Sequence, residues 1–441
     1  MSAGVAPVGA RSNRPQVDRW RQFLLLAALT GFVGSVLGLE RPIVALIAVR
    51  QFHVTSYLAI LGFVISFGTA KAVSNLVAGR LCDRYGRRRT LLAGWLLGVG
   101  EPVVIVLAPA WSWVVLANVL LGMQQGVCWT TLISMMIDRT RPPNRGFAAG
   151  VNEFAGYTGV ALATFTAGYL AARFGLRPAP FLPSLLFIGA GLALTAILVD
   201  DTPAPRLAVS QVLPLDLLAL PLSAVRDVRL LGCSQAGLIA NLVDATVWGL
   251  LPLHFAHRGL PLNQIGLVAG AYPLSWGLGQ LLTGPLSDRI GRRLPITLGM
   301  TGQGMTIITF LVTNTFPTWF VLAIVLGAFR ALTYPTLIAA AADTAGDGLR
   351  ASVLGVYRFY RDCGFVVGGV VGGIVADRGG IPAAVAVAGG LAICSAAVAF
   401  AMLRPTGLSD TVADIRPEGV AAQVGKPVHD GGGGRVEIRE R

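Results

Sequence analysis

The sequence predicts an all-α integral membrane protein with twelve transmembrane helices arranged in two six-helix halves. Three observations support this fold class. Of the 441 residues, 54% are hydrophobic and only 13% are charged, which is too apolar for an ordinary soluble protein. The apolar residues gather in runs of about 20, the length at which a helix spans a bilayer. Finally, segments of the first half recur in the second half at a constant offset.

The offset is set by two short arginine-rich loops. GRLCDRYGRRR at 79–89 returns as GPLSDRIGRR at 284–293, so that Asp288 follows Asp83 by 205 residues. The same offset relates two further pairs of segments, 121–138 with 326–343 and 145–154 with 350–359. Two membrane halves related by duplication are a recurring architecture of secondary transporters.

Taken in chain order, the apolar runs predict a helix at each of twelve places. These spans are 22–48, 56–81, 90–109, 112–136, 146–173, 181–199, 229–254, 263–286, 294–313, 317–341, 350–376 and 381–403. They divide the chain into an N-terminal half at 22–199 and a C-terminal half at 229–403. The remaining predicted regions are a cytoplasmic N-terminal tail at 1–21, a proline-rich cytoplasmic linker at 200–228 and a disordered cytoplasmic tail at 404–441.

The arginines predict the orientation of the spans. Loops carrying them face the cytoplasm in membrane proteins, whereas the turns at 109–111 and 314–316 have neither arginine nor lysine. We therefore expect a multi-pass protein of the plasma membrane, monomeric, with both termini cytoplasmic. The formal charge of +13 follows from this topology and predicts contact with the bilayer and no nucleic-acid partner.

The repeated loop resembles the signature between helices 2 and 3 of the major facilitator superfamily of secondary transporters. The resemblance implies that the protein moves a small molecule by alternating access. It also implies a cytoplasmic gate whose residues are Asp83, Arg84, Gly86 and Arg87, with Asp288 and Arg289 in the second copy. Asp83 ends a helix whose dipole is negative there, so a partner on the other half would hold the outward-open state. A topology anchor and tight turn is the alternative role.

Ionisable side chains inside the spans are costly and indicate functional sites. They are Glu40, Arg41, Lys71, Glu101, Glu153, Asp244, Arg330, Arg358, Arg361 and Asp362. Because five are acidic and five basic, mutual neutralisation is one interpretation. Arg358 and Asp362 stand four residues apart on one helical face and are expected to pair. Arg361 would then share Asp362 or bind a substrate anion.

The resemblance places the first, fourth, seventh and tenth helices around a central cavity. Glu40, Arg41, Asp244 and Arg330 are therefore the leading cavity residues. Glu40 and Asp244 are the expected proton carriers, because a buried carboxylate can exchange protons, and Glu153 comes next. Glu101 is expected to be a structural partner, whereas Lys71 is left open between substrate contact and ion pair.

The function predicted from these residues is proton-coupled secondary transport, with export of an anionic or anion-chelated small solute. The family's drug–proton antiporters carry an arginine in helix 4 where this chain has Asn118, and a proline in helix 5 that GVNEFAGYTG at 150–159 lacks. An exporter of lipophilic drugs is nevertheless the alternative, followed by a transport-dead receptor. The sequence has no nucleotide loop and no metal-ligand spacing, so neither an enzyme, a cofactor nor a metal is expected.

Overall fold

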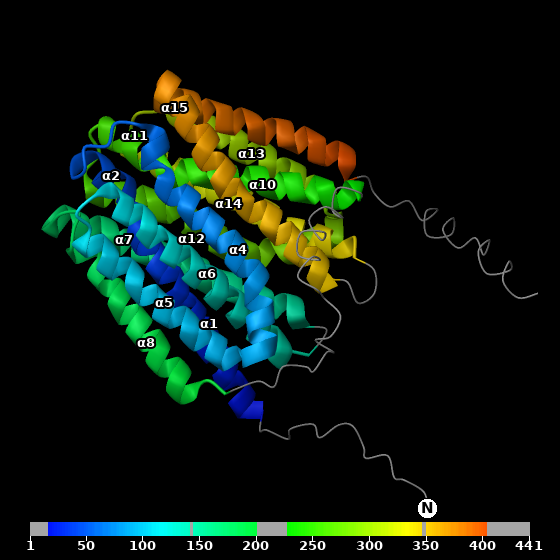
Figure 1. Ribbon diagram of the computed structural model, residues 1–441. Helices are drawn as coiled ribbons and strands as arrows, with labels where there is room; N and C mark the ends of the chain where they lie inside the picture. The colour runs from blue at the N-terminus through cyan, green and yellow to red at the C-terminus, as the bar shows by residue number, and fades with distance from the viewer. Residues whose placement is uncertain (1–15, 142–143, 201–226, 346–349, 404–441) are drawn as a thin grey trace, which may run out of the picture. The chain divides into compact units, whose positions relative to one another are not determined.

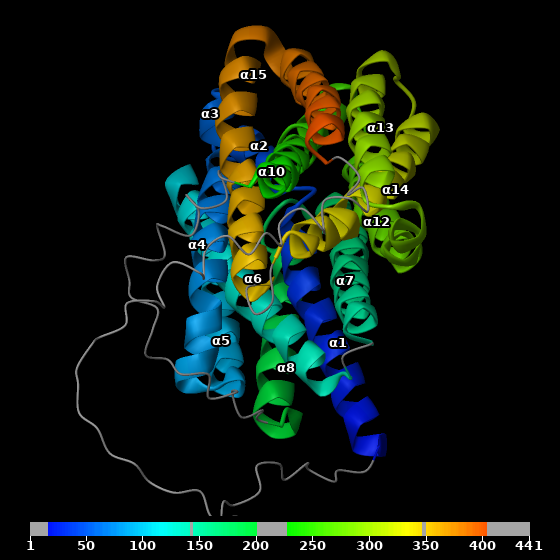
Figure 2. The ribbon, with the colours of Figure 1, turned by 90° about the vertical axis from the view of Figure 1, so that its right-hand side faces the viewer.

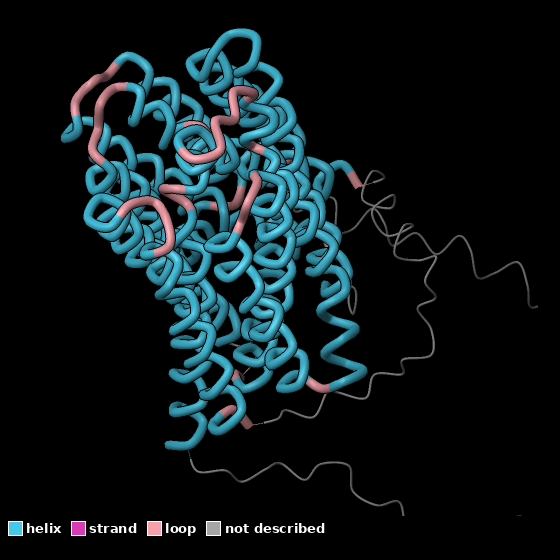
Figure 3. Tube along the Cα trace, turned by 60° about the vertical axis from the view of Figure 1, so that its left-hand side comes forward, coloured by secondary structure: helices cyan, strands magenta, loops and turns pink. Residues whose placement is uncertain are grey.

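The computed structural model describes residues 16–141, 144–200, 227–345 and 350–403. These residues form helices joined by short loops, and no strand occurs among them (Figures 1 and 3). Ten of the helices are long and apolar enough to cross a membrane. The first fifteen residues, nearly all of the predicted linker and the predicted disordered tail lie outside the described residues.

The N-terminal half begins earlier than predicted and contains two interrupted spans. Its helices are α1 (Gln16–Glu40), α2 (Val44–Arg50), α3 (Tyr57–Ile60), α4 (Gly62–Tyr85), α5 (Arg87–Leu107), α6 (Trp111–Arg139), α7 (Arg145–Phe174) and α8 (Leu182–Leu198). The predicted first span is split into α1 and α2 at Arg41–Ile43. Pro42 accounts for this break, because proline lacks an N–H and disfavours helix in the residue before it.

The C-terminal half repeats this plan. Its helices are α10 (Val228–Gly249), α11 (Leu251–His257), α12 (Leu262–Ile290), α13 (Arg293–Val312), α14 (Phe316–Asp343) and α15 (Arg350–Met402). Helix α15 contains two predicted spans, because Gly380 has a φ of 76° and turns the chain back on itself (Figure 2). Helix occupies all twelve predicted spans, including α7, which length and hydropathy alone do not select.

The two arginine-rich loops have the same structure in both halves. Gly86 and Gly291 each adopt a φ of 84°, a left-handed conformation that glycine adopts without steric cost. Just after each glycine an arginine pairs with the aspartate that ends a later helix, Arg87 with Asp138 and Arg292 with Asp343. Both partners of the second pair lie 205 residues beyond those of the first, so the duplication extends to side-chain contacts.

Helices of the two halves contact each other, α7 against α12 and α4 against α15. The contacts are tightest at the end of the bundle away from the arginine-rich loops, which we call the opposite end. There a Cβ built on Gly168 would lie 2.6 Å from the Cα of Gly266, and one on Gly373 would lie 2.5 Å from the Cα of Leu58. At the arginine-rich end a Cβ on Gly150 or Gly355 would meet no atom within 4 Å. The halves are thus closed together at the opposite end.

Candidate functional site

A network of buried polar side chains crosses the boundary between the halves. Glu153 of α7 accepts hydrogen bonds from the Trp129 indole at 2.8 Å and from the Tyr334 hydroxyl at 3.2 Å. The Tyr334 hydroxyl in turn accepts a hydrogen bond from Arg361 at 2.9 Å. Trp129 and Tyr334 stand at equivalent places in the two halves, 205 residues apart. The duplicated aromatic pair therefore holds one carboxylate at the interface.

The expected pairing of Arg358 with Asp362 is wrong. Asp362 pairs instead with its neighbour Arg361, whose guanidinium approaches the carboxylate to 2.7 Å. Asn75 of α4 and Asn241 of α10 also donate hydrogen bonds to Asp362. These partners fix the carboxylate on the side of the helix facing α4 and α10. Because Asn75 belongs to the N-terminal half, Asp362 is a second crossing point of the network.

A second ion pair lies deeper in the C-terminal half. Asp244 and Arg330 are each 1% exposed, with 2.8 Å between carboxylate oxygen and guanidinium nitrogen. Asp244 also accepts a hydrogen bond from the Tyr272 hydroxyl, and Arg330 donates one to Asn241 at 2.6 Å. Asn241 thus joins this pair to Asp362. Both charges are neutralised and hydrogen-bonded, as buried ion pairs require.

Glu40 and Arg41 lie at the break between α1 and α2. They form an ion pair of 3.4 Å, and the guanidinium stacks between the rings of Phe67 and Trp248, 4.4 and 4.5 Å from their centroids. Such cation–π contacts partly replace the water that a buried cation loses. Glu101 of α5 is also 0% exposed, and its two carboxylate oxygens make no hydrogen bond among the described residues.

Lys71 differs from the other buried cations. Its ammonium lies 5.4–5.9 Å from the ring centroids of Phe67, Trp129 and Phe365, at the meeting of α4, α6 and α15. Asp362 is among the charges acting on it. The structure shows no ion pair or hydrogen bond to Lys71 among the described residues, and its side chain is partly exposed. Arg358 likewise makes no ion pair there.

The predicted gate residues lie at the arginine-rich end, and the ion pairs that Arg87 and Asp288 form lie within their own halves. Asp83, Arg84 and Arg289 are exposed, and the described residues offer Asp83 no ion pair. Asp288 pairs within its own half with Arg292. The predicted tie from Asp83 to the C-terminal half is therefore absent from this conformation of the described residues.

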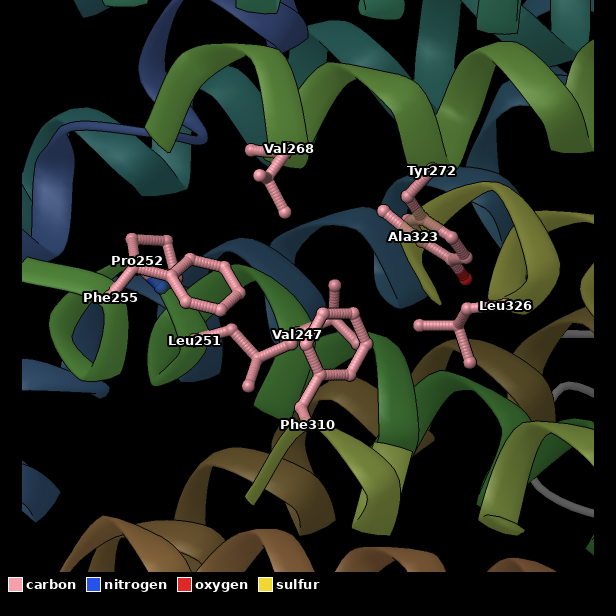
Figure 4. A pocket seen from close by; sticks show the side chains of 10 residues that line it. Val247, Leu251, Pro252, Phe255, Val268, Tyr272, Phe310, Ala323 and Leu326 are labelled. Atoms are coloured by element: carbon pink, nitrogen blue, oxygen red, sulfur yellow. The ribbon is translucent and has the colours of Figure 1, made fainter. Parts of the chain in front are cut away.

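The pocket in Figure 4 lies in the C-terminal half near the opposite end. Apolar side chains of α10 to α14, such as Leu251, Phe255 and Phe310, line it together with Tyr272, whose hydroxyl hydrogen-bonds to Asp244. No charged residue is among the lining residues. An ion would lose its hydration there without gaining a partner, so this pocket does not suit a charged solute.

The structural role expected for Glu101 stays a prediction, whereas the amides of Asn75 and Asn241, which hydrogen-bond to Asp362, were overlooked. Glu101 is directed inward because Gly98, one turn earlier, packs directly on Gln124 of α6. The sequence could have indicated this inward direction of Glu101, because Gly94 and Gly98 are small residues four apart, and such residues mark the face of a helix that packs on a neighbour.

Comparisons with known proteins agree with this architecture. A model described as Major Facilitator Superfamily matches residues 23–238 and 235–423. The multidrug resistance protein MdtG of Escherichia coli O81 (strain ED1a) is 24% identical over 406 residues, which cover 89% of this chain and 97% of that protein. MdtG of Escherichia coli strain K12 / DH10B is 24% identical over 399 residues, covering 87% and 95%.

Two solved structures share the fold at low sequence identity. One is the nucleoside transporter NupG (D323A mutant), with a TM-score of 0.73, 14% identity, and coverage of 87% of this chain and 100% of that one. The other is a bacterial homologue of the human lysosomal transporter Spinster, in an inward-facing and unoccupied conformation. Its TM-score is 0.69 at 14% identity, covering 88% of this chain and 98% of that one.

Proposed function

This chain belongs to the Major Facilitator Superfamily and is therefore a membrane transporter of small molecules; on that premise, we propose that it exports a small organic anion in exchange for protons. The transport class is a property of the family. The anionic solute, the coupled proton and the outward direction are the parts proposed here.

The unpaired ammonium of Lys71 carries the anionic assignment. Arg41, Arg330 and Arg361 each have a carboxylate partner, so they are not free to bind a solute without breaking an ion pair. Lys71 lies between the halves without such a partner among the described residues. Its ammonium is only partly exposed and is surrounded by aromatic rings, so it has lost part of its hydration and would be stabilised by a counter-charge, which a bound anion would supply.

The rings around Lys71 favour an anion with an aromatic or other flat apolar body. Phe67, Trp129 and Phe365 would contact such a body while the ammonium binds its acidic group. Small-molecule sites commonly combine an apolar lining with one or two polar groups that fix the ligand's orientation.

Export of lipophilic drugs is the second candidate. The relatives named above are called multidrug resistance proteins, and their name also favours the outward direction. In this chain a row of aromatic rings crosses the interface: Tyr157 packs on Trp276 at 3.7 Å between centroids, and Trp276 on Tyr334 at 5.3 Å. Such a row suits a neutral or cationic drug, with Glu153 as its anchor.

Alternating access explains how the network would work. Closure at the opposite end by Gly168, Gly373 and their partners corresponds to an inward-facing state, given the predicted orientation. In the outward-facing state those contacts would separate, and the tie from Asp83 would form at the arginine-rich end. Glu153 and Asp362 each bridge the halves through hydrogen bonds, so a solute or proton bound at the network would bias this equilibrium.

The remaining assignments follow from topology. We place the protein in the plasma membrane as a monomer, with the arginine-rich end and both termini in the cytoplasm. In this proposal the stretches at 1–21, 200–228 and 404–441 are cytoplasmic, and the two halves at 22–199 and 229–403 span the membrane.

Thermal unfolding of the purified protein tests the anionic assignment. Benzoate and salicylate should raise the melting temperature of the wild type saturably, because a ligand that binds the folded state stabilises it by mass action. The rise should disappear in Lys71→Gln and persist in Arg173→Gln, a control at an exposed residue in the last turn of α7. A rise with tetraphenylphosphonium that depends on Glu153, with no response to the carboxylates, would instead establish the drug-export alternative.

A further inference from the structure

Two opposite charges at the boundary between the halves make no ion pair among the described residues. One is Lys71 of α4, whose ammonium is surrounded by aromatic rings. The other is Glu153 of α7, which is 5% exposed and accepts its hydrogen bonds from two neutral groups, the Trp129 indole and the Tyr334 hydroxyl. Both charges therefore remain available to pair with a solute.

The same indole ring contacts both of these charges. The Lys71 ammonium lies over the ring of Trp129, 5.8 Å from its centroid, whereas the Glu153 carboxylate accepts a hydrogen bond of 2.8 Å from the indole nitrogen at the edge of the ring. Gly156 of α7 makes room for this ring, because a Cβ built there would lie 2.4 Å from a ring carbon. One aromatic ring thus separates the cation from the carboxylate, and a single small molecule can reach both.

Aromatic side chains from both halves surround the two charges. Phe67 and Phe365 lie on the side of the ammonium, and Tyr157 and Tyr334 lie on the side of the carboxylate. Phe365 and Tyr334 belong to the C-terminal half, and the other two rings belong to the N-terminal half. A molecule bound between the charges would therefore contact both halves and would pack best with a flat aromatic body.

A solute with a single charge would suit only one end of this site. An anion at Lys71 would neutralise the ammonium but would be repelled by the carboxylate of Glu153 beyond the same indole. A cation at Glu153 would meet the opposite difficulty. A zwitterion supplies both counter-charges at once, so neither partly desolvated group is left uncompensated. Charge-assisted hydrogen bonds at its two ends would add to the contacts made by its ring.

We propose that the transported solute is an aromatic zwitterion, whose acidic group binds Lys71 and whose ammonium group binds Glu153. This inference rests on the anion site proposed above for Lys71 and names the class of solute that the site takes. It joins in one molecule the acidic group assigned to Lys71 and the cationic group for which Glu153 is the anchor. Trp129 is then the ring on which the body of the solute packs.

Two small benzoates that differ in one group test this inference. The first, 4-(aminomethyl)benzoate, is an aromatic zwitterion, and the second, 4-ethylbenzoate, has a methyl group in place of the ammonium. Calorimetric titration of the purified protein in detergent measures both dissociation constants. The wild type should bind the zwitterion about tenfold more tightly than the anion, the factor that one hydrogen bond between charged groups contributes.

Single variants assign each end of the solute to its residue. Glu153→Gln should bind the zwitterion about tenfold more weakly and the anion no more weakly than the wild type does. Glu153→Asp retains the charge and should retain a preference for the zwitterion. Lys71→Gln should weaken the binding of both compounds. Arg173→Gln, at an exposed residue of α7, is the control and should change neither dissociation constant.

The outcomes separate this inference from the anion site on which it rests. Equal affinity of the wild type for the two compounds, or a preference for the zwitterion that survives Glu153→Gln, would overturn the zwitterion while Lys71-dependent binding of 4-ethylbenzoate upheld the anion site. Binding of neither compound would overturn both. Thermal unfolding shows which variants are folded, and the comparison of the two compounds on the wild type decides the matter even if Glu153→Gln does not fold.

Discussion

At the residue scale, removing one partner of the Asp244–Arg330 ion pair should strongly destabilise the protein. Both side chains are 1% exposed, and removing one partner of a buried pair leaves the other charge uncompensated. We expect Arg330→Met to reduce the free energy of unfolding by on the order of 3–5 kcal/mol, measured as a lower melting temperature in detergent. The double variant Asp244→Leu/Arg330→Met should recover most of the loss. A double variant as unstable as the single one would show that packing, not charge, dominates there.

The residue scale is also where sequence reasoning fails most clearly. Helical spacing alone favours Arg358 for Asp362, but the carboxylate is oriented by Asn75 and Asn241 from two other helices. No periodicity within α15 contains that information. The pairing of Arg87 with Asp138, in contrast, was accessible from the sequence, because both residues recur 205 positions later.

At the element scale, glycines of one helix have opposite roles in packing. In α7, Gly168 has no room for a side chain because the backbone of Gly266 fills the space, whereas Gly150 faces no atom within 4 Å. We expect Gly168→Val to lower the melting temperature by separating α7 from α12. Gly150→Ala should leave it unchanged or raise it slightly, since alanine favours helix by up to about 1 kcal/mol. Equal effects of both substitutions would refute the assigned contact.

Elements were predictable in number but not in continuity. Apolar runs of spanning length locate all twelve spans, and Pro42 marks the break in the first. The division between α10 and α11 at Leu250 was not predicted, because the apolar run continues through it. The turn at Gly380 was predicted as a boundary between spans, and its positive φ agrees with the glycine found there.

At the scale of the whole molecule, two aspartates lie at opposite ends. Asp377 accepts hydrogen bonds from the Ser56 hydroxyl and from the backbone amides of Tyr57 and Leu58, so a carboxylate of the C-terminal half caps a helix of the N-terminal half. Asp83 has no such partner among the described residues in this conformation. The two residues should therefore stabilise opposite conformations.

Spin labels at the exposed residues Arg50 and His257 can report the separation of the halves at the opposite end. Asp377→Asn weakens the cap, so the distance distribution should shift toward longer distances. Asp83→Asn removes a tie that would form only in the other conformation, so it should shift the distribution toward shorter distances. Asp288→Asn, whose partner lies in its own half, is the control and should cause no shift. Shifts in the same direction for Asp83 and Asp377 would contradict opposing roles.

The overall plan of two halves was predictable because segments of the first half recur in the second. The site at their interface was not predictable in this way. Its crossing points, from Glu153 to Tyr334 and from Asn75 to Asp362, depend on how the halves are docked. The way in which the two halves pack against each other cannot be read from any periodicity in the sequence.

The matched ion pairs of Arg87 with Asp138 and Arg292 with Asp343 have a consequence for the history of this protein. A contact present at the same register in both halves is most simply inherited from a single ancestral gene of half the length. That ancestor already joined its third helix to the end of its fourth. The buried carboxylates of the interface do not recur at this offset: Arg358 stands opposite Glu153, and Tyr157 opposite Asp362. The two copies therefore share their scaffold contacts and differ in the chemistry at their interface.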